Sequence, residues 1–81
     1  MNARRAQEVF GEVLREARIR RGLSQEALAL ESGVDRTFVS KIERGVRQPS
    51  LTTIFRLAEV LQINPSKVLA RVEQRIARHG A

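Results

Sequence analysis

The chain has no cysteine and no tyrosine, and its one histidine, His79, lies near the C-terminus. The lack of cysteine excludes a disulfide and a thiolate metal site, and a single histidine does not make a metal-binding cluster. The same scarcity leaves no thiol, phenol or imidazole in the body of the chain for nucleophilic or acid–base chemistry. We therefore expect no metal, no cofactor and no enzyme activity, with a pair of carboxylates as the one catalytic alternative left open.

Long apolar runs are also missing. No stretch approaches the roughly 18 residues that span a bilayer, and the N-terminal "MNARRAQEVFGEV" lacks the apolar region of a signal peptide. We therefore expect a cytoplasmic protein with no membrane partner. Its 81 residues, 42% of them hydrophobic, suffice for one domain but not for two. We expect a single domain over 1–81, with a core from about 6 to 77 and frayed ends.

Acidic residues are few relative to basic ones. The chain has 15 Lys and Arg against 9 Asp and Glu, which gives a formal net charge of +6. Between positions 36 and 56 the only acid is Glu43, whereas the cations are Arg36, Lys41, Arg44, Arg47 and Arg56. This distribution favours nucleic acid as the partner, although a solvated basic surface would give the same total charge.

What the sequence does contain is a series of helical patterns with short breaks between them. Apolar residues recur at i, i+3, i+4 and i+7 from Phe10 to Ala17, which predicts a helix over about 5–21 that ends at Gly22. Four further helices are predicted to follow capping residues, namely Ser24, Asp35, Ser50 and Asn64 with Pro65. No segment alternates like a strand, so we expect an all-α chain of five helices.

The second and third predicted helices are joined by a short turn that contains Gly33. Two helices joined in this way form a helix-turn-helix, which holds its second helix where it can enter the major groove of DNA. With Val39 and Ile42 facing inward, the outer face of that helix carries only polar residues, which are Arg36, Thr37, Ser40, Lys41 and Arg44. The pattern therefore predicts a recognition helix.

The segment 14–61, "LREARIRRGLSQEALALESGVDRTFVSKIERGVRQPSLTTIFRLAEVL", closely resembles the lambda Cro/repressor-like (Xre) family of helix-turn-helix DNA-binding proteins. The shared residues are Arg18, Gly22, Ser24, Gln25, Ala29, Gly33, Ile42, Glu43, Arg44, Gly45, Pro49 and Leu51. Within that family, the short length and "DRTFVSKIERG" look most like the controller proteins of restriction-modification systems. The resemblance implies a compact lambda-repressor-like fold and sequence-specific binding of double-stranded DNA.

The resemblance also implies residue roles. The base-reading positions correspond to Arg36, Thr37, Ser40 and Lys41, whose groups suit guanine acceptors and the thymine methyl. The positions that contact phosphate correspond to Ser24, Gln25, Arg44, Arg47 and Gln48. Phe38, at the margin of the inward face, either packs in the core or meets a sugar or a thymine methyl.

Two further pairs of residues each leave two interpretations. Arg18 and Glu43 match a family pair that braces the first helix against the third; the alternative is two independent surface charges. Val72 and Ile76 extend the apolar stripe of the last helix. They either form a self-association surface or pack on their own domain.

Together these features predict a transcriptional regulator that binds a palindromic operator as a homodimer and needs no small-molecule ligand. The alternative is a protein-interaction module, such as the antitoxin partner of a toxin, in which DNA binding is secondary. The modest stripe of the last helix favours the regulator.

Overall fold

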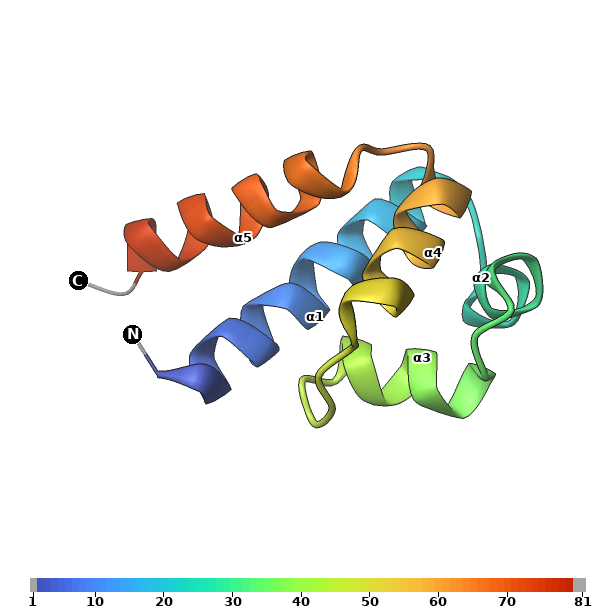
Figure 1. Cartoon of the computed structure of the whole chain (residues 1–81), viewed down its shortest axis with the longest axis horizontal. Helices are drawn as coiled ribbons and strands as arrows, with labels where there is room; N and C mark the ends of the chain where they lie inside the picture. Colours follow the sequence, from blue (N-terminus) through green and yellow to red (C-terminus); the bar gives the residue numbers. More distant parts are fainter. Residues whose placement is uncertain (1, 80–81) are drawn as a thin grey trace.

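The computed structural model describes residues 2–79, which form five helices and no strand (Figure 1). In chain order these are α1 (Ala3–Arg20), α2 (Gln25–Ser32), α3 (Arg36–Glu43), α4 (Leu51–Leu61) and α5 (Pro65–His79). The prediction of an all-α chain with five helices is confirmed for this part of the chain. Of the ends expected to fray, positions 3–5 belong to α1 and positions 78–79 belong to α5, whereas positions 1, 80 and 81 lie outside the described residues.

The helix α1 is the central element of the fold. It packs against both α5 and α3, while α4 contacts α2 and α5. Figure 1 shows α5 running alongside α1, with α3 on the other side of α1 and with the start of α1 and the end of α5 at the same end of the molecule. The candidate recognition helix therefore lies on the far side of α1 from α5.

Side-chain caps begin the helices close to where the sequence predicts them. Ser24, Asp35 and Ser50 each accept a hydrogen bond from the backbone N–H three residues further on, at 3.0, 3.3 and 3.1 Å. The first helix begins earlier than predicted, because Asn2 Oδ1 accepts from the N–H of Arg5 at 2.7 Å. Each cap satisfies an N–H group that has no partner inside its helix, which fixes where these short helices start.

The core combines apolar side chains from all five helices. Its largest fully buried members are Val9, Val13, Leu14, Leu28, Val39, Ile42 and Leu57. Burying a side chain of this kind contributes about 1.5–3 kcal/mol relative to leaving it in water. None of the helices in the described region is both long and apolar enough to cross a membrane.

The last helix packs on its own domain. Val68 and Val72 are only 3% and 8% exposed, and Ile76 packs half-buried against the same core. This is the second of the two alternatives for Val72 and Ile76, because α5 lies along α1 and turns their stripe toward the core. Self-association through Val72 and Ile76 remains a prediction.

Arg75 adds a polar contact between α5 and α1. Its guanidinium donates to both carboxylate oxygens of Glu16, at 2.7 and 2.8 Å, and to Glu12 at 3.3 Å. The bonds from Arg75 hold the pKa of Glu16 below its ordinary value. The resulting contribution to stability is present at neutral pH and is lost as the pH falls through that lowered pKa, and it is small because both acids are exposed.

At Gly11 the backbones of α1 and α3 meet directly. A methyl group at this position would overlap the carbonyl oxygen of Ile42 and lie 2.9 Å from that of Glu43. Both oxygens belong to the helix backbone, which cannot move aside as the end of a flexible side chain could. Gly11 therefore allows α3 to sit as close to α1 as it does.

We predict that Gly11→Ala lowers the free energy of unfolding by about 1–3 kcal/mol, because the added methyl group pushes against the α3 backbone. Urea denaturation measures this change. Arg15→Ala, on the exposed side of the same helix, is the control and should change stability by less than about 0.5 kcal/mol. A Gly11→Ala protein more stable than the original, as helix propensity alone would make it, contradicts the close contact.

Candidate nucleic-acid interface

The turn between α2 and α3 sets the angle at which α3 is presented. Gly33 ends α2 with a φ of 73°, a left-handed conformation that glycine adopts without strain. The N–H groups of Gly33 and Val34 both donate to the carbonyl of Ala29, at 2.9 and 3.2 Å. Ala29 and Val34 are buried where the helices meet. The chain thus folds here as the predicted helix-turn-helix.

The outer face of α3 is polar and points away from the core. Val39 and Ile42 are 0% exposed and hold the opposite face in place. The predicted base-reading residues are Arg36 and Thr37, which are exposed, and Ser40 and Lys41, which are half-buried. Within residues 2–79 neither Arg36 nor Lys41 forms an ion pair with an acid. The two cations are therefore available to an external anion or acceptor.

Phe38 lies at the edge of this face. It is half-buried and packs against the core, which is the first of the two alternatives for this residue. Its ring anchors the start of α3 beside Arg36 and Thr37.

Further exposed polar side chains lie before α2 and after α3. Ser24 is exposed at the start of α2, and Arg44, Arg47 and Gln48 are exposed after α3. Arg44 directly follows the helix, whereas Arg47 and Gln48 stand in the loop that leads to α4. Their contact with phosphate remains a prediction.

Gln25 has an intramolecular partner that the sequence did not indicate. Its Nε2 donates to Glu43 Oε1 at 3.0 Å and so ties the first turn of α2 to the last turn of α3. An amide has two donor hydrogens and an acceptor oxygen, so this bond leaves Gln25 further capacity for a phosphate. The predicted phosphate contact is compatible with this geometry and is not tested by it.

Arg18 and Glu43 form a paired and nearly dry contact between α1 and α3. Arg18 Nε and Nη2 donate to the two oxygens of Glu43 at 2.6 and 3.0 Å, and Nη1 donates to the carbonyl of Leu23 at 2.8 Å. The side chains are 12% and 2% exposed. The hydrogen bond from Arg18 to Glu43 raises the pKa of Arg18. Of the two interpretations for Arg18 and Glu43, the structure shows the pair that braces α1 against α3, because two independent surface charges would be exposed to water.

Gln7 makes a second contact between α1 and the end of α3. Its Nε2 donates to the carbonyl oxygen of Gly45 at 2.9 Å, across 38 positions of sequence. No periodicity or cap signal could indicate this bond, because it joins residues that only the tertiary fold brings together. Gln7 thus belongs to the structural support of the interface.

This geometry defines a helix-turn-helix domain whose second helix carries a basic outer face, with Arg36 and Lys41 in no ion pair among residues 2–79. Residues 14–68 match the helix-turn-helix family, and the chain belongs to that family. Over 62 residues the chain is 39% identical to the control protein C.BamHI of Bacillus amyloliquefaciens, a match that covers 75% of this chain and 76% of the relative.

Solved structures give the same assignment. The restriction-modification controller protein C.AhdI from Aeromonas hydrophila is 48% identical with a TM-score of 0.75, covering 76% of this chain and 94% of that one. The biofilm master regulator SinR, solved in complex with DNA, is 28% identical with a TM-score of 0.71, covering 74% and 97%. The resemblance to the Xre family and its controller proteins is therefore confirmed.

We predict that Glu43→Ala lowers the free energy of unfolding by about 3–5 kcal/mol, because it leaves the guanidinium of Arg18 buried without its partner. Replacing both residues with apolar ones, in Arg18→Met/Glu43→Leu, should recover most of that loss. Urea denaturation of the single and double variants checks both expectations. The cycle uses Arg18→Met and Glu43→Leu as its single variants, and losses of these two that simply add in the double variant would mean that the charges act independently.

Proposed function

We propose that the protein regulates transcription by binding a palindromic operator in double-stranded DNA as a homodimer in the cytoplasm. The observation that carries this function is the outer face of α3, whose cations form no ion pair in the described part of the chain and which Arg18 and Glu43 hold from behind. Membership of the helix-turn-helix family and the likeness to SinR in complex with DNA support it. The relatives are control proteins and regulators, so no enzymatic role is assigned.

The proposed division of labour follows from the position of each side chain. Arg36, Thr37, Ser40 and Lys41 project from the face that enters the major groove, where arginine and lysine suit guanine and threonine suits the thymine methyl. The flanking residues Ser24, Gln25, Arg44, Arg47 and Gln48 would contact the phosphates on either side. The flanking contacts orient the helix, and the face reads the sequence.

The direct test is selection of bound duplexes from a random DNA pool at near-physiological salt, followed by sequencing. We expect an inverted repeat with half-sites roughly 34 Å apart, because a two-fold dimer presents two recognition helices to one side of the duplex. If no sequence is enriched, the proposed role as a transcriptional regulator is rejected and the protein-interaction module becomes the proposed function.

Arg36→Ala and Arg47→Ala are predicted to weaken binding in different ways. Arg36→Ala should cost about 1–3 kcal/mol at the operator and relax the preference at particular base pairs. Arg47→Ala should weaken binding equally on all sequences and reduce the slope of log K against log salt by about one unit. Titrations of operator and scrambled duplexes at several salt concentrations separate the two effects.

The control for this pair is Arg78→Ala, which removes an exposed cation from α5 on the far side of α1. It should leave both affinity and base preference close to those of the unmodified protein. A uniform loss for Arg36→Ala would move that residue to the phosphate-contacting group.

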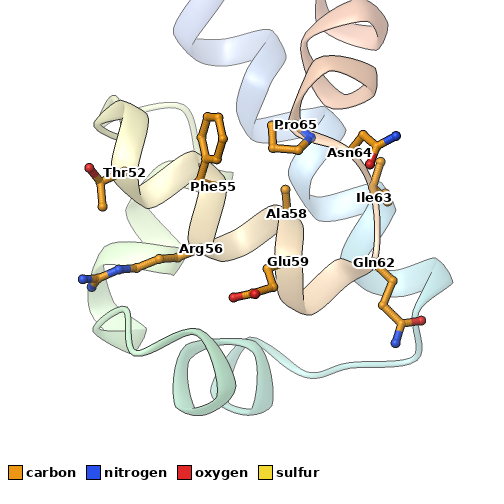
Figure 2. Close-up of a pocket in the computed structure, with 9 residues that line it drawn as sticks. All are labelled: Thr52, Phe55, Arg56, Ala58, Glu59, Gln62, Ile63, Asn64 and Pro65. Atoms are coloured by element: carbon orange, nitrogen blue, oxygen red, sulfur yellow. The ribbon is translucent and has the colours of Figure 1, made fainter.

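The homodimer needs a surface, and the apolar face of α4 and the start of α5 supplies one. Leu51 and Phe55, one helical turn apart on α4, are 66% and 55% exposed. Phe55 and Pro65 line an open groove of about 440 Å³ at the turn between α4 and α5. Figure 2 shows these two side chains above Ala58, with Arg56 and Glu59 below it. Large apolar groups exposed together are typical of an interface.

We propose that a second copy of the chain binds this groove, because the groove carries one positive and one negative side chain. Two copies related by a two-fold axis can pair these opposite charges. Arg56 and Glu59 line the same groove, are exposed and do not pair with each other or with other residues within the described part of the chain. In a two-fold contact the same patch meets itself, so Arg56 of one copy would face Glu59 of the other. A dimer with this two-fold symmetry would thus pair Arg56 and Glu59 of both copies and cover Phe55.

We predict that Phe55→Glu raises the dissociation constant of the dimer by about 30-fold or more, the effect of losing about 2 kcal/mol at a central aromatic contact. Sedimentation equilibrium over a concentration series measures it. Leu30→Glu is the matched control, because Leu30 is 84% exposed on α2, away from the groove.

Exchange of the charges tests the register of that dimer. Arg56→Glu and Glu59→Arg should each weaken association, and the double variant should restore it. If Phe55→Glu associates as the unmodified protein does, the interface lies on another face.

A further inference from the structure

We propose that Gln7 is a positioning residue for DNA binding, which fixes the loop 45–49 so that Arg47 and Gln48 are ordered before DNA arrives. This inference rests on the proposed function, because its consequence is measured on the operator. The residue itself is half-buried in α1 and its role is to hold backbone.

The first anchor of the loop is Gly45. The N–H groups of Gly45 and Val46 close the end of α3 by bonding to the carbonyls of Ile42 and Lys41, each at 3.0 Å. The carbonyl of Gly45 points the other way and accepts from Gln7 Nε2 at 2.9 Å. With Gly45 at a φ of 76°, a methyl group there would lie 3.1 Å from Glu8 Cα, so this residue rests directly on α1.

The second anchor is Pro49, which is buried at the other end of the loop. It lines an apolar groove of about 340 Å³ together with Gln7, Phe10 and Ile54. Both ends of the loop therefore lie beside the same stretch of α1. Between the two anchors, Val46, Arg47 and Gln48 are exposed.

This arrangement affects binding through conformational entropy. A loop that is mobile in the free protein loses backbone and side-chain freedom when Arg47 meets a phosphate, and that loss subtracts from the affinity. A loop that is already held loses less. The bond from Gln7 to Gly45 would therefore raise affinity without any contact between Gln7 and DNA.

The experiment compares Gln7→Leu, which keeps most of the side-chain volume and removes the donor, with the unmodified protein on the selected operator. We expect a loss of roughly three- to tenfold in affinity, the range of one net hydrogen bond, equal on all sequences and with unchanged base preference. The matched control is Gln74→Leu, at an exposed position of α5, which should bind as the unmodified protein does. Gln7→Met, which keeps the length of the side chain without a donor or a charge, is the second variant if the leucine lowers the folded fraction.

A second background distinguishes positioning from general destabilisation. In a protein that already carries Arg47→Ala and Gln48→Ala, the loss of operator affinity caused by Gln7→Leu should shrink to less than twofold. The loop then has no DNA-contacting side chain left to position. Relaxation of the backbone amides of Val46 and Arg47 in the free protein should show greater mobility in Gln7→Leu, with α1 and α3 unchanged.

Three results would overturn the inference: unchanged operator affinity in Gln7→Leu, an undiminished loss in the Arg47→Ala/Gln48→Ala background, or loop amides as rigid as in the unmodified protein. The failure of the proposed function looks different, because the unmodified protein would then select no operator. The relaxation measurement on the free protein needs no DNA. It tests whether Gln7 restricts the motion of the loop, whether or not the protein selects an operator.

Discussion

The attachment of α3 to α1 is the constraint on which the rest of the interface depends. Gly11 lets the two backbones touch, and the pair of Arg18 with Glu43 fixes the end of α3 with charge-assisted hydrogen bonds. Gln25 extends the same network to α2 through Glu43. A helix of 8 residues is too short to be stable alone, so its orientation is a property of these contacts.

Much of this fold could be predicted because the residues at the helix ends determine where the helices begin and end. Ser24, Asp35 and Ser50 are caps whose function needs only the next three residues, and Gly33 marks a turn by its backbone freedom alone. The polar face of α3 also followed from helical spacing. These sequence patterns involve residues a few positions apart, so they can be recognised without knowledge of the tertiary structure.

The remaining features depend on which helix faces which. Nothing near Gln7 or Gly11 indicates that each meets the end of α3, and the partner of Gln25 is likewise distant in sequence. The stripe of α5 was compatible with two outcomes until the position of α5 along α1 placed Val72 in the core. The brace of Arg18 with Glu43 was anticipated only through the family resemblance.

The separation of supporting and outward-facing residues has a consequence for how this protein can diverge. Among the described residues, the side chains of Arg36, Thr37, Ser40 and Lys41 make none of the hydrogen bonds or ion pairs that hold the domain together. Mutations of the exposed Arg36 and Thr37 therefore carry little penalty in folding. Under the proposed function, two copies of the domain that differ only on this face would bind different operators while sharing the same supporting contacts.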